Sequence, residues 1–127
     1  MFLGLRTVIY PAADLAASKM WFTRLLGVEP YFDEPFYVGY HVGGYELALD
    51  PNAESGSGPI TYWGVANADD ALATLVAAGA TLIGAVQDVG DGIRVARVLE
   101  PGGSLLGIIE NPAFTVVNVP NADGPGR

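Results

Sequence analysis

The side chains of His41 and Glu46 could carry chemistry, and they flank a Gly43-Gly44 dipeptide. Adjacent glycines accept the positive φ angles of a tight turn, so the dipeptide predicts a β-hairpin over residues 36–50. With that turn, His41 lies directly opposite Glu46 on the neighbouring strand. An imidazole beside a carboxylate can act as a general base or hold a polar group of a ligand. A simple cross-strand surface pair is the plainer interpretation, and the spacing leaves all three open.

The same hairpin has two predicted faces of different character, because side chains alternate along a strand. One face is entirely apolar and should pack beneath a helix; it comprises Val38, Tyr40, Val42, Tyr45, Leu47 and Leu49. The other face is polar, and adds Tyr37 and Asp50 to the pair of His41 and Glu46. A polar face of this kind is either solvated or lines a cleft.

Further candidates lie in the second half of the chain. Tyr62 and Trp63 follow Ile60 in a short β-type run, so alternation turns their rings to opposite faces. One ring would then face a cleft and the other the helix layer. The plainer interpretation, that both rings belong to the core, stays open.

Arg94 stands in a second predicted hairpin, residues 92–110, that turns at residues 100–103. That turn would place Arg94 opposite Ile109. The guanidinium could then meet an anionic group of a ligand, or remain a solvated residue near the strand end.

The composition excludes several classes of protein. The 127 residues include no cysteine, so disulfides and thiolate metal sites are excluded. The net charge is −8 and no basic stripe exists, so nucleic acid and anionic membranes are poor partners. No apolar run approaches the roughly 20 residues of a membrane span, and no leader is evident at the N-terminus. We therefore expect a cytoplasmic protein; its acidity suits a cationic ligand or serves solubility.

The chain contains an internal duplication, in which residues 5–30 and 60–84 both read as a strand followed by a capped helix. Asp14 and Gly27 mark the ends of the first helix, and Asn67 and Gly79 those of the second. The apolar residues expected on the buried sides of the helices are Leu15, Met20, Trp21, Phe22, Leu25 and Leu26, then Ala68, Leu72, Leu75 and Val76.

This duplication predicts one α+β domain over residues 1–127, built from two βαβββ modules. The modules cover about 3–50 and 60–112, with a linker at 51–59 and a tail at 113–127. Each module is too small to bury its helix and sheet well alone, so the two should pair.

Three segments resemble the vicinal-oxygen-chelate superfamily of glyoxalases, bleomycin-resistance proteins and extradiol dioxygenases. They are TVIYPAADLAASKMWFTRLLGVEP, WGVANADDALATLVAAGATL and QDVGDGIRVARVLEPGGSLLGIIENP. The resemblance implies a U-shaped mixed sheet around a cleft, with the helices outside, and commonly a homodimer. It also implies that Ile60 and Tyr62 face the cleft.

The resemblance implies that metal-dependent members of that superfamily carry histidine, glutamine or glutamate as metal ligands. The corresponding positions in this chain are Thr7, Ile60 and a position near Gly107. These residues supply no adequate set of donors for a divalent metal, and His41 is the single histidine. We therefore expect no metal and no other cofactor. A site built only from the carboxylates of Glu46, Asp50 and Glu110 remains an alternative.

The predicted function is metal-free binding of a small, largely apolar or aromatic molecule, with bleomycin-resistance proteins as the analogue. The predicted ligand-binding residues are Tyr37, His41, Glu46, Ile60, Tyr62 and Arg94. The alternative is a metal-independent lyase or isomerase that uses Glu46 or His41 as general base. The expected partners are the ligand and a second copy of the chain.

Overall fold

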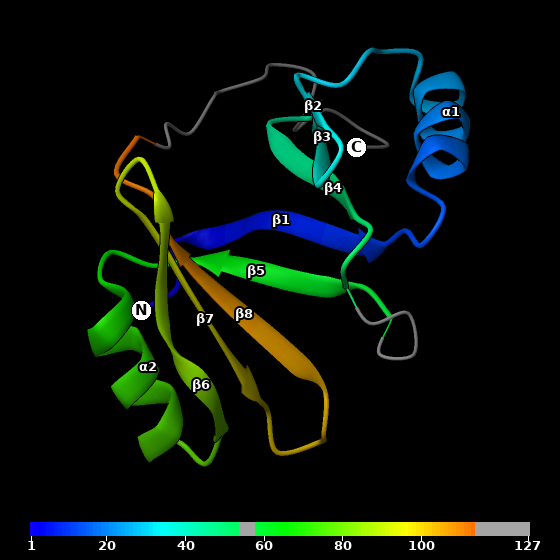
Figure 1. Cartoon of the computed structure of the whole chain (residues 1–127). Coiled ribbons are helices and arrows are strands. Elements are labelled where there is room, and N and C mark those ends of the chain that lie inside the picture. Colours follow the sequence, from blue (N-terminus) through cyan, green and yellow to red (C-terminus); the bar gives the residue numbers. More distant parts are fainter. Residues whose placement is uncertain (54–57, 114–127) are drawn as a thin grey trace, which may run out of the picture. The chain divides into compact units, whose positions relative to one another are not determined.

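The chain folds into two compact units, each with one helix and four strands. The computed structural model describes residues 1–53 and 58–113 (Figure 1). Of these, residues 7–53 and 58–59 form the first unit, and residues 60–113 form the second together with residues 1–6. The linker predicted at 51–59 lies partly outside the described residues, and the predicted tail lies almost wholly outside them.

Strands and helices follow one another as two βαβββ repeats, so the fold class is α+β, as the sequence predicts. The elements are β1 (Gly4–Pro11), α1 (Leu15–Leu26), β2 (Phe32–Glu34), β3 (Tyr37–Val42), β4 (Tyr45–Asp50), β5 (Ile60–Gly64), α2 (Ala68–Ala77), β6 (Thr81–Gly90), β7 (Ile93–Leu99) and β8 (Leu105–Glu110).

Both units have the same strand order. The first runs β1-β4-β3-β2 and the second runs β5-β8-β7-β6. The first strand of each unit pairs in parallel with the last, because a helix carries the chain across, and the remaining pairs are antiparallel. This repeated order confirms the duplication.

The first six residues belong to the second unit, whereas the first module was predicted to begin at about residue 3. The backbone N–H of Leu3 donates to the carbonyl oxygen of Gly64 at 2.8 Å. The ring of Phe2 lies 4.9 Å from that of Trp63, centroid to centroid. These contacts with β5 tie the start of β1 to the second unit.

The Gly43-Gly44 hairpin forms with the predicted register, which pairs His41 with Glu46 and Tyr40 with Leu47. Both glycines have positive φ, +58° and +89°. Four of the six residues of the predicted apolar face, Val38, Tyr40, Leu47 and Leu49, pack under α1. Val42 and Tyr45, next to the turn, are instead 37% and 56% exposed. The core of the first unit comprises Ala12, Val38, Tyr40 and Leu49, joined by Leu15, Phe22, Leu26 and Leu47.

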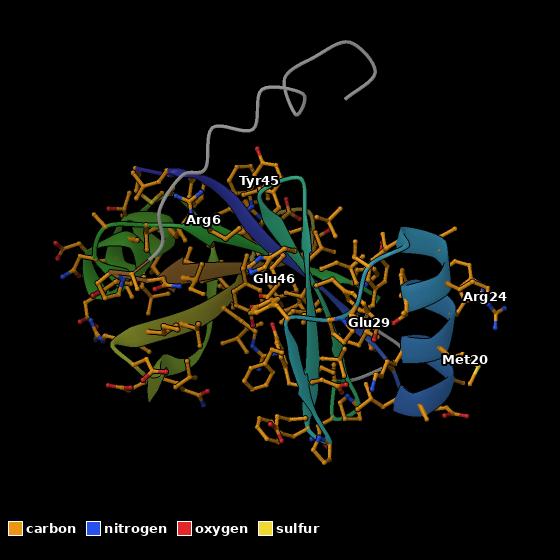
Figure 2. All side chains as sticks on the ribbon, turned by 90° about the horizontal axis from the view of Figure 1, so that it is seen from above. Arg6, Met20, Arg24, Glu29, Tyr45 and Glu46 are labelled. Atoms are coloured by element: carbon orange, nitrogen blue, oxygen red, sulfur yellow. The ribbon has the colours of Figure 1, made fainter. Side chains whose placement is uncertain are left out.

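Three of the six apolar residues of α1 that were predicted to be buried are exposed. Met20, Trp21 and Leu25 are 63%, 55% and 63% exposed. A helix turns by about 100° per residue, so Leu15, Phe22 and Leu26 share one narrow arc that excludes the other three. Figure 2 shows Met20 and Arg24 pointing away from the sheet of this unit.

Three of the four predicted helix caps are confirmed, whereas the C-terminal cap of α2 is Ala78 rather than the predicted Gly79, which follows it. The Asp14 carboxylate accepts from the backbone N–H of Ala17 at 3.1 Å, and Gly27 adopts a left-handed conformation after the last turn of α1. In α2 the Asn67 side chain accepts from the N–H of Asp70 at 2.9 Å. These caps set where each helix begins.

The core of the second unit lies between α2 and its sheet, and Figure 1 shows α2 running beside β6 and β7. The core comprises Val65, Ala68, Ala71, Ala96 and Ile108, joined by Leu72, Leu75, Val86 and Leu106. Val76 was predicted to be buried on α2 and is instead 43% exposed.

The second hairpin also forms, but its predicted register is wrong by one residue. Arg94 pairs with Glu110 and Val95 with Ile109, because Leu99 pairs with Leu105. The loop therefore includes Ser104, whose carbonyl oxygen accepts from the N–H of Glu100 at 2.9 Å. Because the loop is one residue longer than predicted, every residue of β7 pairs with a residue of β8 one position further along the chain.

None of the helices in the described part of the chain is both long enough and apolar enough to cross a membrane.

Tyr40→Phe should lower the free energy of unfolding by about 1 kcal/mol, because the Tyr40 hydroxyl is fully buried and bonded twice. It donates to the carbonyl oxygen of Lys19 at 3.0 Å and lies 2.8 Å from the Thr23 hydroxyl. Urea denaturation measures the change. Tyr45→Phe is the matched control, since Tyr45 lies on the same hairpin but is 56% exposed. Equal effects of the two substitutions would contradict the assignment.

Candidate ligand-binding face

The face of the first unit's sheet that points away from α1 has the Glu46 carboxylate at its centre. We call it the Glu46 face; its side chains are Thr7, Ile9, Tyr31, Phe32, Glu34, Tyr37, His41, Glu46, Ala48 and Asp50, around Gly39. Strand alternation and the observed registers place the β-strand members on this side.

Three hydroxyl groups donate to the Glu46 carboxylate. Thr7 of β1 donates to Oε1 at 2.9 Å, and Tyr37 of β3 donates to the same oxygen at 3.0 Å. Tyr31, which precedes β2, donates to Oε2. A carboxylate offers about four lone-pair positions, so most of the acceptor capacity of Glu46 is used within the protein. The arrangement favours a Glu46 carboxylate held in one orientation over a mobile base.

Tyr31 is held in place from three directions. Its ring stacks on the imidazole of His41, with centroids 3.9 Å apart and planes inclined by 15°. Its backbone N–H donates to the carbonyl oxygen of Gly39 at 2.9 Å. Burial first, and then the bond to Glu46, raise the pKa of the Tyr31 hydroxyl above its ordinary value. The hydroxyl therefore stays protonated at neutral pH and remains a donor to Glu46.

Gly39 makes room for this arrangement. A Cβ atom at position 39 would lie 2.6 Å from Oε2 of Glu46 and 3.0 Å from Cε1 of Tyr31. The first distance is far below van der Waals contact, and the second is tight. Only a residue without a side chain lets the carboxylate and the Tyr31 ring lie over β3 at the same time.

The structure brings three of the six predicted site residues together: Tyr37, His41 and Glu46 all lie on the Glu46 face. Ile60 and Tyr62 belong to β5 of the second unit. There the ring of Tyr62 covers Gly107, where an added Cβ would lie 2.6 Å from two ring carbons. Ile60 is buried.

Arg94 lies on the α2 side of the second unit's sheet. Its guanidinium donates to Asp69 at 2.6 Å and to Oε1 of Glu110 at 3.3 Å. The same Glu110 oxygen accepts from the backbone N–H of Ala68 at 2.8 Å, at the start of α2. Arg94 therefore stabilises the N-terminus of α2 through Asp69 and Glu110. Its pairing with Glu110 was not predicted because the predicted register was wrong by one residue.

The donors expected of a metal site of this superfamily are poorly represented. Ala12 N–H donates to Asp50 O in the first unit, as Val65 N–H donates to Ile109 O in the second. These two hydrogen bonds are equivalent, so Ala12 corresponds to Val65 and Asp50 corresponds to Ile109. Five residues before Val65 is Ile60, the counterpart of Thr7, and four residues before Ile109 is Leu105, the counterpart of Glu46. Neither counterpart carries a donor atom.

The residues therefore do not fit the family's metal chemistry. Thr7 and Glu46 supply oxygens in the first unit but are already bonded to each other. No group of three or more histidine, cysteine or carboxylate side chains in the described residues could hold a metal ion. The alternative set of Glu46, Asp50 and Glu110 is not such a group.

Sequence reasoning missed the roles of Tyr31 and Gly39. Tyr31 lies before a three-residue strand, where no alternating pattern indicates the direction of a side chain. Gly39 stands within a strand, and a strand glycine is a general signal of close approach by another group. That signal, applied to position 39, would have pointed to the Glu46 face.

Comparison with known proteins identifies the family. The model of the Glyoxalase/Bleomycin resistance protein/Dioxygenase superfamily matches residues 4–108. No curated protein matches the chain.

Solved structures similar to this chain share its fold. A methylmalonyl-CoA epimerase variant from Streptomyces coelicolor, in complex with 2-nitronate-propionyl-CoA, is 18% identical with a TM-score of 0.70, covering 90% of this chain and 98% of that one. The methylmalonyl-CoA epimerase from Mycobacterium tuberculosis is 19% identical with a TM-score of 0.68, covering 87% and 89%. A superfamily member from Vibrio splendidus 12B01 is 22% identical with a TM-score of 0.63, covering 84% and 97%.

Gly39→Ala should lower the free energy of unfolding by about 1–3 kcal/mol, the usual cost of forcing an atom into occupied space. It should also displace Tyr31 from His41, which removes the ring-current shift of the imidazole protons in an NMR spectrum. The control is the same change in a Glu46→Ala background, where the nearest obstacle is absent and the cost should shrink. An unchanged His41 spectrum in Gly39→Ala would contradict this account of the Glu46 face.

Proposed function

The chain belongs to the Glyoxalase/Bleomycin resistance protein/Dioxygenase superfamily, and from that premise we propose that it binds a small, largely apolar or aromatic molecule without a metal ion. The Glu46 face is the proposed contact surface in the first unit. The observation that carries the proposal is the group of aromatic rings around one hydrogen-bonded carboxylate.

The composition of this face suits a planar ligand. Besides the Tyr31–His41 stack, the rings of Phe32 and Tyr37 meet edge to face, with centroids 5.9 Å apart and planes inclined by 74°. Small-molecule sites usually combine apolar and aromatic walls with a few fixed polar groups. Here Glu46 is the fixed polar group, and its three hydroxyl donors hold it in one orientation.

Ile60 and Tyr62 remain proposed ligand contacts of the second unit. Arg94 also stays a predicted contact, although its ion pairs with Asp69 and Glu110 give it a structural role already. The homodimer and the cytoplasmic location likewise stay predictions; light scattering at micromolar concentration tests the dimer.

A metal-independent lyase or isomerase is the second candidate. His41 favours it, because this imidazole is exposed and lies opposite Glu46 in the hairpin register. A neutral imidazole beside a carboxylate is a common general base. Glu46 itself is a weaker candidate, since its lone pairs already accept three hydroxyl protons.

A ligand screen by thermal shift, followed by mass spectrometry of each hit, separates the two candidates. For a binder, Tyr31→Ala should weaken binding of a hit about 10–100-fold through loss of a stacked ring, and every hit should be recovered unchanged. Tyr45→Ala is the matched control, because this tyrosine is exposed on the α1 side of the same hairpin. Turnover of a hit, reduced on the order of 10²–10⁴-fold by His41→Ala, would replace the binder with the enzyme.

The purified protein should contain no stoichiometric transition metal by elemental analysis. Its melting temperature should be the same with and without a chelator, because a metal that bound only the folded state would raise it. One zinc, nickel, manganese or iron ion per chain, lost together with stability on chelation, would contradict the proposed metal-free site.

A further inference from the structure

We propose that the Glu46 face selects ligands whose polar group is a hydrogen-bond donor, above all a cationic nitrogen on a planar aromatic body, and rejects ligands that present an anion. This inference rests on the proposed function and specifies the chemical class of ligand. Its basis is the direction of the hydrogen bonds around Glu46.

The hydroxyl protons around Glu46 are already used in hydrogen bonds to its carboxylate. An ionised carboxylate only accepts hydrogen bonds, and a hydroxyl has one proton to donate. Thr7, Tyr31 and Tyr37 each direct that proton to Glu46. Towards a ligand, the Glu46 carboxylate and the Tyr31 hydroxyl therefore offer lone pairs. A ligand group that meets them has to supply the proton.

The charges of the first unit point the same way. The register places Glu34 and Asp50 on the Glu46 face together with Glu46. The two lysine or arginine residues of the first unit, Lys19 and Arg24, both stand on α1. Lys19 forms an ion pair with Asp33. Asp33 is opposite Val38 in the strand register, and Val38 faces α1, so this ion pair lies on the α1 side of the sheet. The described residues of this unit thus provide carboxylates on this face but no permanent cation.

The aromatic rings reinforce the preference for a cation. The negative ring faces of tyrosine and phenylalanine attract a cation within about 6 Å. Tyr31 and Tyr37 donate to the carboxylate and Phe32 lies against Tyr37, so a charged nitrogen could contact a ring and Glu46 together. His41 is the one side chain here that could donate to an anion, and one side of its ring is covered by Tyr31.

Two probes of equal shape and opposite charge test the inference: 2-naphthamidine, a cationic donor, and 2-naphthoate, an anionic acceptor. Each is titrated into isotope-labelled protein, and the NMR signals of Tyr31 and His41 report binding at this face. We expect 2-naphthamidine to bind at least about 10-fold more tightly, the scale of one charge-assisted hydrogen bond.

Glu46→Gln should bring the two affinities within about 3-fold of each other, because an amide also donates and carries no charge. Glu29→Gln is the matched control: it removes the same charge from the first unit, at a residue outside the Glu46 face (Figure 2). That variant should keep the wild-type ratio. The wild-type ratio alone decides the question if Glu46→Gln fails to fold.

The outcomes separate this inference from the proposed function. Equal affinities in the wild-type protein, or tighter binding of 2-naphthoate, with shifts still at Tyr31 and His41, would overturn the donor preference and leave aromatic binding standing. A wild-type ratio that Glu46→Gln leaves intact would also overturn it. Binding of neither probe, or shifts confined to other residues, would overturn both proposals.

Discussion

The arrangement of the first unit depends on keeping one carboxylate hydrogen-bonded on a sheet face. Glu46 is only partly exposed, and removing a charge from water is costly unless hydrogen bonds replace the lost hydration. The replacement comes from β1, from β3 and from the segment before β2, through Thr7, Tyr37 and Tyr31. The requirement of one side chain thus fixes the relative positions of three separate parts of the chain.

The second unit repeats the backbone without repeating this requirement. Ile60 and Leu105 occupy the positions that Thr7 and Glu46 occupy in the first unit, so these two positions carry no charge that requires hydrogen-bond partners. The ring of Tyr62 instead lies on the bare backbone of Gly107. The two units share their strand order and the packing of a helix on the sheet, but they differ in chemistry where Thr7 and Glu46 of the first unit are replaced by Ile60 and Leu105 of the second.

The sequence predicted the fold well where a pattern has a single structural meaning. Capping residues correctly predicted the starts of both helices and the end of α1, and the Gly43-Gly44 turn with strand alternation predicted the pairing of His41 with Glu46. It failed where one residue decides the geometry. Ser104 lengthens the second turn, so Arg94 meets Glu110 rather than Ile109.

The candidate site was harder to predict than the fold, for a related reason. Tyr37, His41 and Glu46 were found because strand register places them on one side. Tyr31 reaches the same side from irregular chain, where sequence offers no periodicity, and its position depends on a vacancy above Gly39. Contacts that depend on a missing side chain leave little trace in a hydrophobic pattern.

That vacancy also limits how this protein can change during evolution. Position 39 cannot gain even a methyl group without moving Glu46 or Tyr31, so the three residues can drift only as a set. A single substitution that adds a side chain there would displace the carboxylate or the Tyr31 ring and so disturb the hydrogen bond between them. The hydrogen atom of one glycine therefore keeps the Glu46 carboxylate within reach of its three hydroxyl donors.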